Sequence, residues 1–312
     1  MNKSAHQVMA PVDWAMLIVL SAIWGGSFFF FAVIIKELPV FTIVFFRVFL
    51  ATVALWLYVL ISRQALPNFK PIWHNFFLMG FFNNVIPFSL IVWGEQRVAP
   101  GLAAVLNATT PFFAVIVAHL STQNEKLTWN RLAGALVGLS GVAALVGYDA
   151  LKNLGVDVWF QLAIVLASMS YGISTIFGRR MAGIPPLVTA ASQTAASSLM
   201  LLPLMLVIDH PFNLALPSLK VLIYLAALAL LCTAVAYIIF FNIVKRAGMT
   251  NVTLVTLLVP ISAMLLGAML LNEQISTRHF LGMAVIGIGL ALIDGRIPRK
   301  IAATLRGQNV TN

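Results

Sequence analysis

Charged residues are scarce in this chain. Aspartate, glutamate, lysine and arginine make up only 9% of its 312 residues, and 61% of the residues are hydrophobic. A soluble domain has about 25% charged residues, so this chain lacks the charge needed to cover a soluble surface. The apolar runs are about 20 residues long and do not alternate with polar residues, which predicts membrane-spanning α-helices rather than the strands of a barrel.

Cysteine is nearly absent as well. Cys232 is the only cysteine, which excludes an intrachain disulfide and a cysteine metal cluster. The acids and histidines fall near the ends of the apolar runs, and the GxxxxGK[ST] loop of ATP-driven pumps is missing. We therefore expect no metal, no cofactor and no catalytic centre, because an enzyme would need acids, nucleophiles or metal ligands that converge at one depth.

The apolar runs predict an all-α membrane protein with ten transmembrane helices and short loops. The expected spans are residues 12–35, 41–62, 72–93, 100–121, 128–147, 157–179, 186–208, 218–243, 250–271 and 277–294. Prolines such as Pro39, Pro67 and Pro185 separate several of these runs, as expected where helices start and stop.

The basic residues predict the orientation of these helices. If the helices alternate in direction, 13 of the 19 lysines and arginines lie on the side of the N-terminus and five lie on the other side, with Arg47 inside a span. Cytoplasmic loops carry the excess of basic residues, so both termini are expected in the cytoplasm. The same distribution accounts for the net charge of +10 without nucleic acid as a partner.

The sequence contains an internal repeat. Residues 21–27 (SAIWGGS) align with residues 168–174 (SMSYGIS) at an offset of 147, and Pro111 aligns with Pro260 at an offset of 149. The two predicted repeats, of five helices each, are residues 1–150 and residues 151–312. Since five is odd, the second repeat must enter the membrane from the opposite side. Inverted repeats are typical of secondary transporters that bind their substrate near the midplane.

Polar, aromatic and proline residues inside the predicted spans are the candidates for a substrate site. The prolines free backbone carbonyls, which predicts either two broken helices beside the site or ordinary kinks. The amides and hydroxyls line a wet cavity or else only join helices by hydrogen bonds. The candidates are Trp24, Arg47, Asn83, Asn84, Asn107, Thr110, Pro111, Tyr171, Gln193, Tyr237, Thr256 and Pro260.

Arg47 has two interpretations. It is the only charged residue well inside a span, and it could pair with the carboxylate of a substrate. Alternatively, it binds backbone carbonyls or a loop acid such as Glu37. Two other acids, Glu125 and Glu273, precede the fifth and tenth predicted helices and are interpreted as structural, because a helix N-terminus favours negative charge.

The ordered set of motifs resembles the EamA family of the drug/metabolite transporter superfamily. The resemblance rests on the Trp24 motif (WGGS), Arg47, the stretch from Pro111 to Glu125, the matching stretch from Pro260 to Glu273, and the glycines after each glutamate. It covers nearly the whole chain, with Tyr171 in the second repeat standing where the first has Trp24. It implies a bacterial inner-membrane carrier of ten helices that exports amino acids, related metabolites or drug-like compounds.

These observations predict a secondary transporter, with the lipid bilayer and a small solute as its partners. A cavity of aromatics and neutral amides suits neutral, zwitterionic or amphipathic solutes. The missing mid-membrane acid predicts that transport is not tightly coupled to protons through a buried carboxylate. The alternatives are a channel, for which no charged ring or filter sequence is visible, and a membrane-embedded enzyme. The sequence does not predict an oligomeric state.

Overall fold

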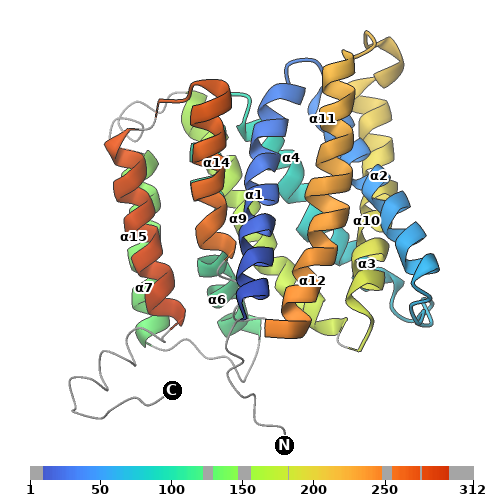
Figure 1. Cartoon of the computed structure of the whole chain (residues 1–312), viewed down its shortest axis with the longest axis horizontal. Helices are drawn as coiled ribbons and strands as arrows, with labels where there is room; N and C mark the ends of the chain where they lie inside the picture. The colour runs from blue at the N-terminus through green and yellow to red at the C-terminus, as the bar shows by residue number, and fades with distance from the viewer. Residues whose placement is uncertain are drawn as a thin grey trace, which may run out of the picture.

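The computed structural model describes residues 10–121, 129–146, 156–181, 183–247, 255–274 and 276–294. Within these ranges the regular structure is entirely helical. The helices run up and down side by side, and α1 begins at the end of the bundle where α15 finishes (Figure 1). The fold class predicted from composition is therefore confirmed at the level of an all-helical bundle.

The elements follow the predicted spans closely. In chain order they are α1 (Pro11–Ile34), α2 (Val40–Ile61), α3 (Trp73–Gly80), η1 (Phe81–Val85), α4 (Ile86–Gly94), α5 (Pro100–Asn107), α6 (Thr110–Ser121), α7 (Trp129–Val146), α9 (Val156–Arg180), α10 (Pro186–Leu204), η2 (Met205–Asp209), η3 (Pro211–Asn213), α11 (Leu219–Ala229), η4 (Leu230–Val235), α12 (Ala236–Ala247), α14 (Val255–Leu271) and α15 (Thr277–Asp294). In the described part of the chain, seven helical segments are long and apolar enough to cross a membrane, and residues Leu258–Leu271 form a shorter apolar helix. The chain is thus a multi-pass membrane protein.

Local sequence sets the ends of these helices. Pro100 and Pro186 occupy the first turn of their helices, where the missing N–H of proline costs nothing. His210 and Asn272 follow η2 and α14 with positive φ angles of 47° and 56°, the left-handed conformation that commonly ends a helix. The turns that separate the apolar runs are therefore encoded at single residues.

Of the two alternatives for the prolines, the fourth span shows a break. Helix α5 ends at Asn107 and α6 begins at Thr110. Pro111 deprives the Asn107 carbonyl of its helical N–H partner, and the Thr110 hydroxyl donates to that carbonyl at 2.8 Å instead. The corresponding break at Pro260 is not found, because Pro260 lies inside the continuous helix α14. One missing N–H is not enough to interrupt a helix when the rest of the hydrogen-bond ladder is kept.

Within the described ranges, three π-helical segments interrupt helices where the sequence predicted plain α-helix. Segment η1 lies between α3 and α4, η4 lies between α11 and α12, and η2 follows α10. The first two occupy corresponding positions of the two sequence repeats. A π-turn inserts one residue into the helical ladder and is frequent at functional sites. Local sequence carries no clear signal for it, so these interruptions were missed.

Two glycines allow close helix contacts at equivalent positions. A Cβ atom at Gly25 of α1 would lie 2.8 Å from the backbone nitrogen of Ala263 in α14. A Cβ atom at Gly172 of α9 would lie 2.9 Å from the backbone carbon of Phe113 in α6. Both glycines belong to the repeated motif, and both contacts are helix backbones that approach as small residues permit. The pairs α1–α14 and α9–α6 are therefore built in the same way.

Helices α7 and α15 pack mainly against each other at one edge of the bundle (Figure 1). A Cβ atom at Gly141 would lie 3.1 Å from the carbonyl of Gly282, and one at Gly289 would lie 2.6 Å from the carbonyl of Gly134. This glycine-lined contact agrees with the small-residue faces of the sequence. Glu125, which precedes α7, lies outside the described residues.

Polar contacts join α1 to its neighbours at both ends, to α12 at its start and to the N-cap of α11 beyond its end. Asp13, in the first turn of α1, accepts a hydrogen bond from Arg246 of α12 at 2.7 Å, and the Asp13 side chain is buried. Beyond the other end of α1, Glu37 accepts hydrogen bonds from the backbone and hydroxyl of Ser218 at 2.7 and 2.8 Å. Ser218 is the N-cap of α11.

We expect Gly25→Ala and Gly172→Ala to destabilise the protein. Each added methyl group meets the backbone of a packed helix, and such overpacking costs about 1–3 kcal/mol. Gly287→Ala in α15 is the matched control, because no atom lies within 4 Å of an added Cβ. There the change favours the helix by up to about 1 kcal/mol. Thermal unfolding in detergent measures all three variants, and equal melting temperatures would contradict the close contacts.

Candidate functional site

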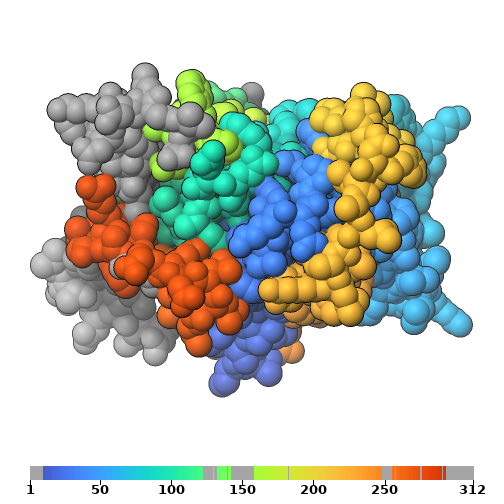
Figure 2. Space-filling model, turned by 90° about the horizontal axis from the view of Figure 1, so that it is seen from above, coloured from blue at the N-terminus to red at the C-terminus, as the bar shows by residue number. Residues whose placement is uncertain are grey.

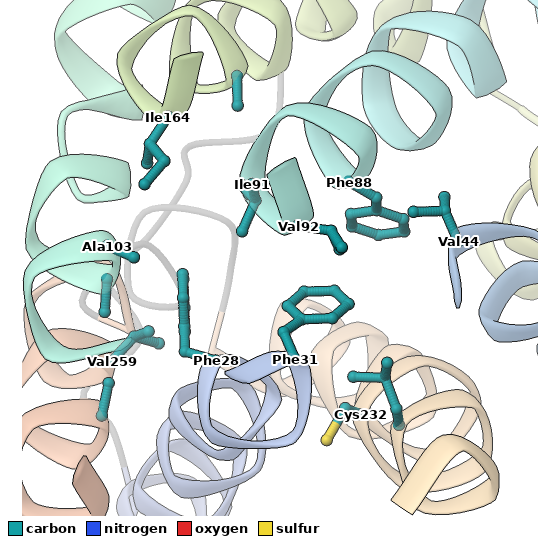
Figure 3. Packing of buried hydrophobic residues seen from close by; sticks show 14 of the residues in the cluster. Phe28, Phe31, Val44, Phe88, Ile91, Val92, Ala103, Ile164, Cys232 and Val259 are labelled. Atoms are coloured by element: carbon teal, nitrogen blue, oxygen red, sulfur yellow. The ribbon is translucent and has the colours of Figure 1, made fainter. Parts of the chain in front are cut away.

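Arg47 lies in the middle of the bundle. It projects from α2, and only 5% of the residue is exposed. Its Nε donates a hydrogen bond of 3.1 Å to the hydroxyl of Thr233 in η4. The guanidinium carbon lies 3.7 Å from the ring centroid of Phe88 and 4.9 Å from that of Phe31. Figure 3 shows these two rings pointing from α4 and α1 into a shared space.

The positive charge of Arg47 has no acidic partner at ion-pair distance among the described residues. The expectation that Glu37 pairs with it is wrong, because Glu37 is engaged by Ser218 in the connection to α11. No described hydrogen bond involves the two terminal nitrogens of Arg47. The ring faces stabilise the cation, since each cation–π contact contributes about 0.5–2 kcal/mol, but they supply no hydrogen-bond acceptor.

A neutral polar network lies between η1, α9, α10 and α12. The Asn83 amide nitrogen donates to the Gln193 side-chain oxygen at 3.3 Å and to the Tyr237 hydroxyl at 3.5 Å. The Gln193 amide also donates to the Tyr237 hydroxyl, at 3.4 Å. The Asn83 oxygen accepts from Ser174 at 3.1 Å. Three of the predicted site residues are thus brought together from three helical segments.

Asn84 extends this network on the buried side. It is fully buried, and its amide nitrogen donates to the Ser197 hydroxyl at 2.9 Å. Its side-chain oxygen is buried without a partner in the described part of the chain. Gln193 and Ser197 lie four residues apart and so share one face of α10. A buried amide oxygen without a donor is costly, so this position favours a donor from a bound solute or water.

The π-segments position these side chains. Asn83 and Asn84 are consecutive, yet both reach α10, because the widened turn of η1 places them on one side. Thr233 in η4 donates its hydroxyl to the Leu228 carbonyl five residues earlier, at 3.1 Å, and receives the Arg47 hydrogen bond. The two corresponding irregular segments therefore supply the amide network and the anchor of Arg47.

The two predicted aromatic walls lie beside these groups. Tyr171 packs against Phe88, with ring centroids 6.5 Å apart, and Phe88 is the ring that covers Arg47. Trp24 packs against Phe240 of α12 at 5.7 Å. Both aromatic residues are partly buried at the border of the main hydrophobic cluster. They connect the charged position to the apolar core.

Of the remaining candidates, Asn107, Thr110 and Pro111 lie at the break in the fourth span, and Thr256 and Pro260 lie in α14. The Ser168 hydroxyl of α9 lies 3.3 Å from both the carbonyl and the side-chain oxygen of Asn107. Thr110 and Pro111 lie next to this contact and are half-buried, as is Thr256 of α14, whereas Pro260 is buried. No described hydrogen bond or ring contact joins Asn107 or Thr110 to Arg47 or Asn83.

Sequence reasoning missed several partners in the site. Phe31 and Phe88 were indistinguishable from other aromatic residues of an apolar helix, although they flank Arg47. Ser197 lies one helical turn beyond Gln193, and this spacing was the available signal. Ser174 closes the motif in residues 168–174 but offers no sign of its bond to Asn83.

Comparison with known proteins agrees with this architecture. A sequence model of the EamA-like transporter family matches residues 13–147 and again residues 158–294. The uncharacterized inner membrane transporter YedA of Escherichia coli K12 is 25% identical over 279 residues, with 89% of each chain covered. The uncharacterized transporter YoaV of Bacillus subtilis is 24% identical, with 88% of this chain and 94% of its own covered.

Two further similarities add to this result. A probable terminal-alkyne amino-acid exporter of Streptantibioticus cattleyicolor is 28% identical over 221 residues, covering 70% of this chain and 72% of its own. A solved crystal structure superposes with a TM-score of 0.65 at 20% identity, covering 92% of this chain and 98% of that one, which shows a shared fold. The prediction of a transporter rather than an enzyme is confirmed by these matches. Since the family model matches most of the chain in two copies, the chain belongs to the EamA-like transporter family.

Proposed function

We propose that this transporter is a secondary carrier that exports small solutes bearing a carboxylate and an apolar part, such as amino acids or related metabolites. The observation that supports this most is Arg47, a buried cation held between two aromatic rings with no described acidic partner. A solute carboxylate would supply that partner, and the neighbouring rings and amides would hold the rest of the solute.

The energetic argument rests on the cost of an unpaired charge. An arginine within the membrane costs roughly 2.5–3.5 kcal/mol or more. Its guanidinium presents a planar pair of N–H donors that fits a carboxylate with two parallel hydrogen bonds. Binding a solute carboxylate at Arg47 therefore gains both charge neutralisation and geometry. One cation suits a single carboxylate and disfavours solutes with several phosphates.

The surroundings of Arg47 suit zwitterionic and amphipathic solutes. Phe31, Phe88 and Tyr171 offer apolar contact area, and the oxygens of Asn84 and Gln193 could accept hydrogen bonds from an ammonium group. The relative from Streptantibioticus cattleyicolor, named as a probable amino-acid exporter, supports the same class of solute.

We further propose that ten spans form two inverted five-helix repeats, residues 1–150 and 151–312, in the bacterial inner membrane. Three features support the inversion: the doubled family match, the corresponding segments η1 and η4, and the equivalent contacts of Gly25 and Gly172. An odd number of spans in each repeat reverses the second one. With ten spans, both termini share one side, which the basic residues assign to the cytoplasm.

Reporter fusions test this topology. A reporter fused after Arg306 should be active only in its cytoplasmic form, because 13 of the 19 basic residues fall on that side. A fusion after Leu216, in the connection before α11, should be active only in its periplasmic form. Periplasmic activity at Arg306, or the same activity at both sites, would contradict ten spans with cytoplasmic termini.

The role of Arg47 can be tested with matched pairs of solutes. Purified protein in liposomes should show counterflow of apolar amino acids, which a channel does not show. Arg47→Gln should lower kcat/KM for the acids about 10–100-fold, because a hydrogen bond between charged groups contributes about 1.5–3 kcal/mol. It should leave the corresponding carboxamides nearly unchanged, since these carry no negative charge.

Arg47→Lys and Arg97→Gln are the controls. The lysine keeps the charge but loses the planar pair of donors, so part of the preference for the acid should remain. Arg97 is exposed in the turn after α4, so its removal should leave the preference unchanged. If Arg47→Gln lowers transport of acids and carboxamides equally, the arginine supports the bundle without recognising a carboxylate.

The amide network makes a second prediction. Asn83→Leu should destabilise the protein by about 1–2 kcal/mol, because Gln193 and Ser174 lose a buried partner. Asn242→Leu is the matched control, since Asn242 is exposed and binds only the carbonyl of Ile238 in its own helix. Thermal unfolding should shift for the first variant alone. Unchanged stability with lost solute binding would mean that Asn83 serves the solute rather than the bundle.

A further inference from the structure

An acid without a partner lies where α4 ends. Glu95 is the C-cap of this helix and is only 6% exposed. Both of its carboxyl oxygens are buried and have no hydrogen-bond partner among the described residues. An ionised carboxylate without donors is strongly disfavoured in such a place. Burial without donors therefore favours the neutral, protonated form of Glu95 over the ionised form.

A second acid reaches the same turn from the other half of the chain. Glu273, which follows α14, accepts a hydrogen bond from the backbone nitrogen of Gly101 in the first turn of α5, at 3.2 Å. Its other carboxyl oxygen is buried and lacks a described partner. Viewed from this end, the segment after α14 (orange) lies against the turn between α4 and α5 (teal; Figure 2). The two glutamates thus converge on one turn.

The electrostatic surroundings favour the protonated form of these two acids. Burial raises the pKa of Glu95 well above its ordinary value, the nearby charge of Glu273 raises it further, and the charge of Arg47 opposes both. Burial also raises the pKa of Glu273, while the hydrogen bond from Gly101 lowers it. Among the described residues, the titratable groups nearest along the chain to these two acids are Arg97, which is exposed, and Arg278 and His279 in the first turn of α15.

We propose that Glu95 and Glu273 form a proton-binding site that keeps this end of the bundle closed while a proton is bound. A proton suits the site better than a metal ion, because no group of three or more metal-binding side chains occurs in the described residues. The turn between α4 and α5, the start of α5 and the end of α14 would separate on opening. Glu95 would then meet water and release its proton.

The direction of the pH effect follows from the two states. In the closed state Glu95 is buried and its pKa is raised, whereas in the open state Glu95 is in water and has an ordinary pKa. The closed state therefore binds more protons, so acid favours closing and rising pH favours opening. The sequence-based interpretation of Glu273 as structural considered this acid alone and did not include Glu95 as its neighbour. The consequence for transport rests on the proposed function, whereas the proton site itself does not.

Infrared spectroscopy tests the proton directly. Purified protein near neutral pH should show the carbonyl stretch of a protonated carboxyl group, and this band should disappear on titration to alkaline pH. Glu95→Gln should lack the band, while Glu37→Gln should keep it, because Glu37 is exposed and is bound by Ser218. A band that persists in Glu95→Gln, or no such band in the parent protein, would overturn the proposal.

Thiol labelling tests the coupling to opening. In a Cys232→Ser background, Leu102→Cys places a thiol in the pocket of about 210 Å³ that Glu273 lines, and Gln96→Cys places an exposed reference thiol on the same turn. The ratio of their labelling rates by a membrane-impermeant reagent removes the pH dependence of the thiol chemistry. At pH values between the ordinary and the raised pKa of Glu95, the labelling rate of Leu102→Cys relative to Gln96→Cys should rise by up to about tenfold per pH unit.

The variants decide between a proton and its alternatives. Glu95→Gln should keep the labelling ratio low at every pH, and Glu37→Gln should behave as the parent. Glu273→Gln should open at a lower pH than the parent, because the charge of Glu273 raises the pKa of Glu95 and its loss lowers that pKa.

Three results would overturn the proposal: a ratio that does not change with pH, a parent-like profile in Glu95→Gln, or a ratio that follows sodium concentration at constant pH. None of these measurements requires a transported solute. A failure to transport amino acids would therefore contradict the proposed function but not the proton site. A failure of the infrared or labelling tests would contradict the proton site but not the proposed function.

Discussion

Lipid offers no hydrogen bonds to a polypeptide backbone, and this constraint governs where the bundle can be irregular. At η1, the carbonyls of Gly80 and Phe82 accept hydrogen bonds from Ser197 of α10 and Ser170 of α9, at 3.2 and 2.7 Å. At the break before α6, Thr110 serves the Asn107 carbonyl in the same way. At these two interruptions hydroxyl groups thus donate to backbone carbonyls, from neighbouring helices at η1 and from Thr110 of the same span at the break. The polar interior of the protein follows from its irregular backbone.

The same constraint explains why the candidate site has its composition. Neutral amides and hydroxyls can satisfy one another inside the bundle, as Asn83, Gln193 and Tyr237 do. A guanidinium needs more, and Arg47 obtains only one hydroxyl and two aromatic faces from the described residues. Among the described residues of the candidate site, Arg47 is therefore the charged position with hydrogen-bond donors left for a solute.

Much of the fold could be predicted from the sequence, because long apolar runs and proline-marked turns depend on local chemistry. The helix bounds mostly agree within one or two residues, and Arg47 and Asn83 were identified because polar groups in apolar runs are costly. The π-segments could not be predicted, since an inserted residue depends on packing against other helices. Glu95 was missed for a related reason: near a helix end, a carboxyl group is exposed or buried according to its neighbours, and sequence position does not distinguish the two.

The fastening of α1 at both ends has a mechanical consequence. Asp13 binds Arg246 at one end, and Glu37 binds Ser218 beyond the other. A helix that is bound to its neighbour at both ends cannot slide along it by one turn, about 5.4 Å, without breaking one of the two contacts. Between these two contacts, the span formed by α11, η4 and α12 contains the π-segment η4, an irregularity of the kind at which helices kink. The two contacts therefore hold both ends of this span beside α1. A change in its curvature is expected at η4, around Thr233.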